Sequence, residues 1–91
     1  MSTRALFYMN DNLYGILHSD GAPTSLGSDF LNISTEKEYK KILSVMCDRY
    51  FPDGDGEEFY SIVDYAYKFE DNSVYVKHWN GDYELGKNIL N

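Results

Sequence analysis

The chain has 91 residues, 43% of them hydrophobic and 16% aromatic, which suffices for one domain with one core and leaves no room for a second. Fifteen acidic against eight basic residues give a formal net charge of −7, which opposes binding to nucleic-acid phosphates. A single cysteine, Cys47, excludes an internal disulfide, and no segment is typical of a signal peptide or membrane span. We therefore expect one cytoplasmic domain over residues 1–91 that binds neither nucleic acid nor membrane directly.

The first predicted elements are two strands joined by a tight turn. Residues Arg4 to Met9 are mostly apolar, and so are residues Leu13 to His18. Between them, Asn10 to Asn12 favour a turn because Asn and Asp tolerate a left-handed backbone. This order predicts a β-hairpin.

A helix is predicted to begin after Thr35. Thr35 and Glu38 form a capping-box pattern, in which the hydroxyl accepts from the third backbone N–H and the carboxylate reaches back to the cap. Pro52 is expected to stop the helix shortly after its last apolar residue. The apolar residues that follow with helical spacing are Tyr39, Ile42, Leu43, Met46, Cys47 and Tyr50.

Three further strands are expected beyond the loop that follows Pro52. The first alternates from Val63 to Glu70, which predicts one wet face and one inward face. The second runs from Val74 to Trp79, and because Val76 and Trp79 differ in parity, some aromatic surface should stay exposed. The residues predicted to share the inward face of the first of these strands are Val63, Tyr65, Tyr67 and Phe69.

The last predicted strand is short, from Tyr83 to Leu85, and follows a hairpin turn at Asn80-Gly81, where both positions accept positive φ. The complete order is strand, strand, helix and then three strands. It predicts an α+β fold, with an antiparallel sheet of four to five strands packed against one main helix.

The segment from His18 to Gly27, H-S-D-G-A-P-T-S-L-G, resembles part of a group of short bacteriophage and prophage proteins of unsettled function. Those proteins begin M-[ST]-T-R and carry H-W-D-G-Y-P-x-x-x-G after their second strand. Ser19 and Ala22 stand where that group has Trp and Tyr. The resemblance implies a phage-derived accessory protein. The matching residues are Thr3, Arg4, His18, Asp20, Gly21, Pro23 and Gly27, and the later strand of the group resembles D-Y-A-Y-K-F from Asp64.

The same segment has two physical interpretations, a rigid structural loop and a site for a small anionic ligand. Asp20 can form an Asx-turn and Gly21 permits positive φ, which suits a rigid loop. Arg4 and His18, on adjacent strands, could instead hold an anion with the loop amides, in one subunit or across a homo-oligomer interface. A nucleotide signal is one such ligand.

Catalytic and metal-binding chemistry finds little support in this sequence. Asp53 to Asp64 resembles a calcium loop, but Glu58 stands at the position that needs glycine. Cys47 lies on the apolar helix face and is interpreted as a core thiol. We expect no enzyme activity, no metal and no cofactor.

The negative charge lies in the second half of the chain, where it is interleaved with tyrosines. Residues from Asp48 to Glu84 include ten acidic and three basic residues, a balance of −7 that equals the charge of the whole chain. Tyr is enriched at specific interfaces. The leading hypothesis is a counter-defence protein that binds and inhibits a host protein, such as a nuclease or a CRISPR-type defence complex, by mimicking nucleic acid. The predicted partner-binding residues are Asp53, Asp55, Glu57, Glu58, Tyr60, Glu70, Asp71 and Tyr75.

Overall fold

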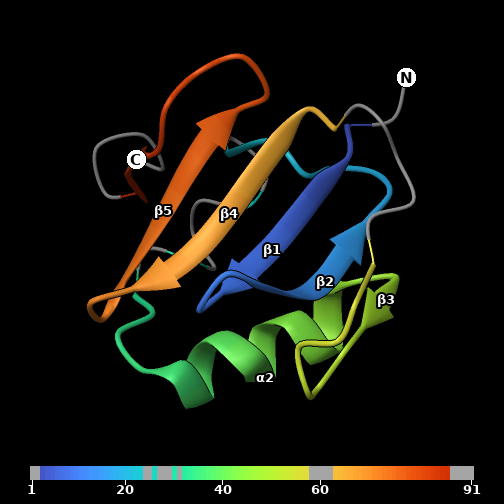
Figure 1. The fold of residues 1–91 in the computed structure, drawn as a ribbon, viewed down its shortest axis with the longest axis vertical. Coiled ribbons are helices and arrows are strands. Elements are labelled where there is room, and N and C mark those ends of the chain that lie inside the picture. Colours follow the sequence, from blue (N-terminus) through green and yellow to red (C-terminus); the bar gives the residue numbers. More distant parts are fainter. Residues whose placement is uncertain (1–2, 24–25, 27–29, 31, 58–62, 87–91) are drawn as a thin grey trace.

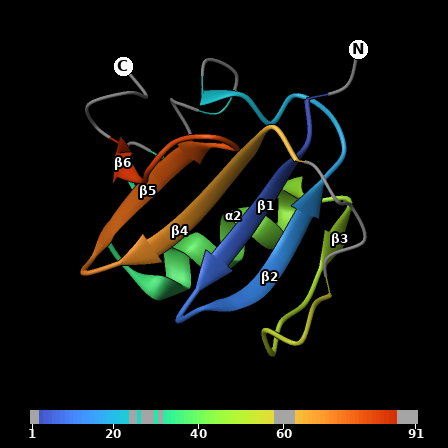
Figure 2. The same cartoon turned by 45° about the horizontal axis from the view of Figure 1, so that its top comes forward.

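The computed structural model describes residues 3–23, 26, 30, 32–57 and 63–86, and all the elements named below lie within them. One sheet of six strands has the order β3-β2-β1-β4-β5-β6, and α2 lies across one of its faces (Figures 1 and 2). This confirms the α+β class, with more strands than the sequence predicted. The elements are β1 (Ala5–Met9), β2 (Asn12–Leu17), α2 (Glu36–Met46), β3 (Arg49–Tyr50), β4 (Tyr65–Glu70), β5 (Ser73–His78) and β6 (Glu84–Leu85).

The prediction that the sheet is antiparallel is wrong for one pair: the sheet is mixed, because its two central strands, β1 and β4, run parallel. All the other neighbours are antiparallel. After β2 the chain passes through α2 and β3 on one side of β1 and then returns on the other side as β4. A connection of that length can join parallel strands, which a two-residue hairpin cannot.

The predicted turn at Asn10 to Asn12 is confirmed, and the Asn80-Gly81 turn is not of the predicted kind. Asn10 and Asp11 have φ of 54° and 64°, and the turn between β4 and β5 has similar angles at Asp71 and Asn72. Neither Asn80 nor Gly81 has positive φ. The Gly81 N–H donates to the His78 carbonyl at 2.9 Å, so the chain turns there without a left-handed residue.

The capping box of α2 is confirmed, whereas the helix ends earlier than predicted. The Glu38 N–H donates to Thr35 Oγ1 at 3.2 Å, and Glu38 Oε1 accepts from the Ser34 N–H at 3.2 Å. The helix ends at Met46, since Cys47 has an extended ψ of 144°. The Asp48 N–H then donates to the Ile16 carbonyl at 3.0 Å. Pairing with the edge of β2 therefore ends the helix before Pro52 can do so.

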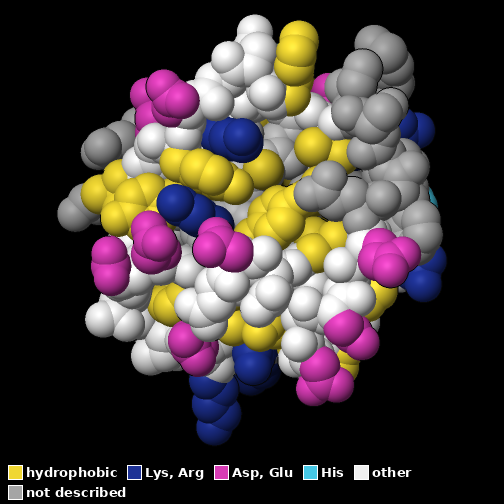
Figure 3. Space-filling view, viewed as in Figure 1, with side chains coloured by type: hydrophobic (Ala, Val, Ile, Leu, Met, Phe, Trp, Pro, Cys, Tyr) yellow, Lys and Arg dark blue, Asp and Glu magenta, His cyan; other side chains and the backbone are white. Residues whose placement is uncertain are grey.

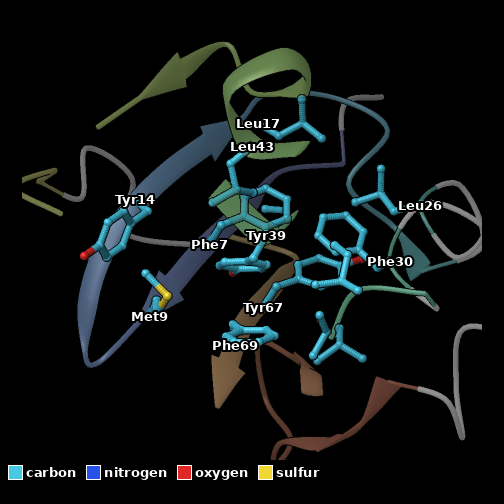
Figure 4. Packing of buried hydrophobic residues seen from close by; sticks show 14 residues of the cluster. Phe7, Met9, Tyr14, Leu17, Leu26, Phe30, Tyr39, Leu43, Tyr67 and Phe69 are labelled. Carbon is cyan, nitrogen blue, oxygen red and sulfur yellow. The ribbon is translucent and has the colours of Figure 1, made fainter. Parts of the chain in front are cut away.

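The main core lies between the sheet and α2 and is built largely from aromatic rings (Figure 4). The rings of Phe7 and Tyr67, on the two central strands, stack with centroids 4.9 Å apart. Tyr39 from α2 stacks on Phe69 at 5.4 Å. Stacked pairs of this kind add to the stability that burial alone provides. The core thus fixes which face of each strand is turned away from α2.

The opposite face of the sheet is only partly covered, and we call it the open face. Leu6, Leu13 and Ile16 are buried there, and Val63 packs against them. The prediction that Val63 shares the inward face of β4 is therefore wrong. The strand begins at Tyr65, so the alternation that holds for Tyr67 and Phe69 does not extend back to Val63.

Candidate functional site

The predicted His18–Gly27 site begins as a loop that is tied to the sheet by backbone hydrogen bonds. The Gly21 N–H donates to the Thr3 carbonyl at 3.0 Å, and the buried Tyr67 hydroxyl donates to the Gly21 carbonyl at 2.6 Å. Asp20 has a φ of 60°, the left-handed conformation that Asp tolerates. These contacts favour the structural interpretation of the loop. Its residues Thr24, Ser25 and Gly27 lie outside the described part of the chain.

The structure brings Arg4 and His18 to neighbouring positions, as predicted, but places carboxylates beside them. Ala5, the first residue of β1, pairs with Leu17, the last residue of β2, so Arg4 and His18 lie just beyond the ends of these strands. The backbone N–H of Arg4 donates to the Asp64 carboxylate at 2.9 Å, and the backbone N–H of His18 donates to the Asp48 carboxylate at 2.7 Å. Two negative charges this close disfavour an anionic ligand at Arg4 and His18.

The predicted partner-binding carboxylates gather at one end of the sheet. Met9, the last residue of β1, pairs with both Asn12 and Phe69, so the β1–β2 turn and the β4–β5 turn lie at the same end (Figure 1). The loop after β3 joins them, because Asp55 bridges to Leu13 at the start of β2. We call this surface the acidic end. Its exposed residues are Asp11, Asp53, Asp55, Glu57, Glu70 and Asp71.

The order and spacing of the strands determine how the carboxylates of the acidic end are arranged. Neighbouring strands lie about 4.8 Å apart, and β1 separates β2 from β4, so the carboxylates form a row along the strand ends. Half-buried Tyr75 lies on β5, opposite Lys68 of β4 and close to the β4–β5 turn. The structure therefore assembles the predicted carboxylates and one predicted tyrosine. Glu58 and Tyr60, also predicted, lie outside the described residues.

Sequence reasoning missed a groove of about 730 Å³ on the open face. Its floor includes Leu6 and Ala66, and two lysines reach over it from β4 and β5. Figure 3 shows Lys or Arg side chains among hydrophobic ones over these two strands, with carboxylates toward the rim. Of the groove residues, only Trp79 could be expected at the surface from the sequence, because Val76 and Trp79 have opposite parity along the predicted strand. The Trp79 side chain is 57% exposed. Its lining residues include Tyr8, Lys68, Lys77, Trp79 and Tyr83.

Cys47 has the properties of a core thiol. It packs against the main core, and a Cβ on Gly15 would come within 2.6 Å of its sulfur. Burial, with a smaller effect of the nearby Asp48 charge, raises the pKa of the Cys47 thiol to about 12. Because the thiolate is the reactive form, this thiol is a poor nucleophile near neutral pH.

None of three comparisons, with protein-family models, with curated proteins and with solved structures, gives a match to this chain. Within the described ranges, no helix has the length and apolar character needed to cross a membrane. The same residues contain no group of three or more His, Cys, Asp or Glu side chains placed to hold a metal ion. The two candidate functional surfaces of the described residues are the acidic end and the groove.

Proposed function

We propose that this protein is a non-enzymatic accessory protein of the phage counter-defence type, which binds and inhibits a host protein in the bacterial cytoplasm. The acidic end is the proposed binding surface, with Tyr75 beside it as an aromatic anchor. The partner is a protein whose lysines and arginines normally contact nucleic acid, such as a nuclease or a defence complex.

The observation that carries the proposal is the convergence of carboxylates from three separate chain segments at one end of the sheet. Glu70 belongs to β4 and Asp71 to the turn that follows it, while Asp11 and Asp55 come from other turns and loops. Rows of like charge steer a partner of opposite charge and exclude partners of the same charge. In this arrangement the carboxylates occupy the places of phosphates in a cationic groove.

The test compares host proteins captured by immobilised wild-type protein with those captured by the variant Asp55→Asn/Asp71→Asn. A partner of the proposed kind should be captured by the wild type, released by added double-stranded DNA, and lost when salt is raised. Mass spectrometry identifies it, and an assay of its nucleic-acid binding with and without this protein measures inhibition.

The matched control is Asp82→Asn/Glu84→Gln, which removes the same two charges from exposed positions beyond the β5 strand. We expect the control to capture and inhibit the partner like the wild type. The acidic-end variant should bind at least about tenfold more weakly, because two charge-assisted contacts are lost. Equal binding by both variants would exclude the acidic end as the binding surface.

A further inference from the structure

We propose that the groove on the open face binds a small ligand that carries both a planar ring and a phosphate, the chemistry of a nucleotide. This inference does not depend on whether the acidic end binds a partner. It rests on the two lysines of the groove, on its aromatic lining and on its size.

Both lysine ammonium groups lie against one aromatic ring. Lys68 Nζ is 4.4 Å from the centroid of the Tyr83 ring, and Lys77 Nζ is 5.2 Å from it. Two positive charges that share one ring repel each other. Lys68 is compensated by Glu70, whose Oε2 lies 3.4 Å from its ammonium group. Among the described residues, no carboxylate oxygen lies within 4.0 Å of Lys77 Nζ.

Lys77 therefore contacts the Tyr83 ring but has no ion-pair partner among the described residues, in a protein with a net charge of −7. Lys77 is half-buried, which removes part of the water that would otherwise solvate its ammonium group. A phosphate placed at Lys77 would supply the missing negative charge, and Lys68 could exchange its exposed contact with Glu70 for the same group. Two ammonium groups on one side of a groove suit a dianion.

The rest of the groove suits a flat ring. Ala66 lies between Leu6 and Lys77 in register across the sheet, and its small side chain leaves a hollow between larger neighbours. Tyr8 and Trp79 line the hollow and offer faces for stacking. A volume of about 730 Å³ lies within the range of roughly 300–1,000 Å³ that is typical of small-ligand sites.

The charges at the rim favour a small ligand over a nucleic-acid strand. Asp11 and Glu70 line the end of the groove that faces the hairpin turns. A strand that continued past this end would place its phosphates beside both carboxylates and beside the rest of the acidic end. A single phosphate at Lys77 avoids them, because Lys77 pairs with Ala66, nearer the other end of β4.

Trp79 is the only tryptophan of the chain and lines the groove, so its fluorescence reports occupancy directly. We would titrate the protein with the four common ribonucleoside monophosphates, with the matching nucleosides and with inorganic phosphate. At least one monophosphate should quench Trp79 saturably and bind about tenfold more tightly than its nucleoside or phosphate alone. No saturable response, or equal affinity for nucleoside and monophosphate, would overturn the proposal.

The decisive variant is Lys77→Gln, which keeps most of the side-chain length and removes the charge. We expect it to weaken monophosphate binding about tenfold and to leave nucleoside binding unchanged. Lys37→Gln, an exposed position on α2, removes the same charge elsewhere and should bind like the wild type. Wild-type affinity in Lys77→Gln would contradict the assignment.

Two further measurements complete the test. Should Lys77→Gln fail to fold, the salt dependence of the wild type replaces it, since salt should weaken binding of the monophosphate and not of the nucleoside. A single-stranded oligonucleotide that binds more tightly than any monophosphate would overturn the small-ligand assignment. The acidic-end variant Asp55→Asn/Asp71→Asn should retain the ligand, which separates failure of this inference from failure of the proposed function.

Discussion

Gly21 shows how one residue without a side chain holds the His18–Gly27 loop on the sheet. A Cβ at this position would lie 2.7 Å from the Ala5 Cβ and 3.0 Å from the Thr3 carbonyl oxygen. The Thr3 oxygen belongs to the backbone and the Ala5 Cβ to a buried side chain, so neither atom can move away by a side-chain rotation. Gly21→Ala should lower the free energy of unfolding by about 1–3 kcal/mol, the range for overpacking a tight site. Urea denaturation followed by circular dichroism measures this change.

Gly81→Ala is the matched control, because the nearest atom to a Cβ there is the His78 carbonyl oxygen at 3.8 Å, an ordinary contact. Its φ is not positive, so alanine fits the backbone, and we expect no loss or a gain of about 0.4–1 kcal/mol. If both variants lose the same stability, the close approach of Gly21 to the sheet is not what holds the loop.

These two glycines also mark a limit of sequence reasoning at the scale of residues. The sequence predicts that Asp20 and Gly21 form a rigid loop, and the structure supports that interpretation. The sequence alone does not show that Gly21 is tightly packed or that Gly81 is free of close contacts. Packing against Ala5 depends on a neighbour sixteen residues away in the chain, which no local pattern encodes.

At the scale of elements, the capping box of α2 predicts a dependence of stability on pH. Glu38 accepts hydrogen bonds from the Ser34 backbone and from Thr35. These bonds lower the Glu38 pKa from its ordinary value of 4.5, and the bond from Ser34 has the largest effect. A lowered pKa in the folded state means that this contribution is present above pH 4.5 and is lost as the pH falls through the folded-state value. Glu38→Gln should therefore flatten the pH dependence of unfolding below pH 4.5.

Two comparisons isolate the cap from general charge effects. Glu36→Gln removes a carboxylate from the same turn and should keep the acid-dependent loss seen in the wild type. Thr35→Ala removes the acceptor of the Glu38 N–H and should cost about 1 kcal/mol at neutral pH. An unchanged acid response in Glu38→Gln would show that the cap does not contribute to it.

The start of α2 could be predicted from sequence and its end could not. Thr35 and Glu38 are local signals, and the helix begins where they place it. The end depends on β2, because Arg49 and Tyr50 pair with Ile16 and Gly15 and form β3. Helical spacing of apolar residues continued to Tyr50, but pairing with a distant strand decided the conformation.

At the scale of the whole molecule, both candidate surfaces depend on strand order. The β1–β2 hairpin was predicted from its turn residues, and the strands β4 and β5 were predicted from their residue patterns. The parallel pairing of β1 with β4 joins the two hairpins, and it places Leu6 beside Ala66 and Tyr8 beside Lys68. Without this pairing the groove has no floor and the two hairpin turns do not share an end. The sequence therefore predicts the carboxylates as a set without predicting the row that they form.

A row of carboxylates on a free protein should reduce its stability, since like charges at the acidic end repel one another. The exposed carboxylates of the acidic end outnumber the lysines near them, and only Glu70 has a described lysine partner. Asp55→Asn/Asp71→Asn should therefore raise the melting temperature at low salt by an amount on the order of 2 °C. Both replacements suit the backbone, because Asn tolerates the positive φ of Asp71 and Asp55 has no positive φ.

Salt distinguishes this repulsion from an effect of the new side chains. Raising the ionic strength should stabilise the wild type and should reduce the difference between wild type and variant, because screening weakens the repulsion that the variant removes. Calorimetry at low and high salt measures both values. A variant that is more stable and yet binds the proposed partner less well would show that the carboxylates serve binding at a cost in stability. If the difference in melting temperature is independent of salt, the row is too widely spaced to act as one charged surface.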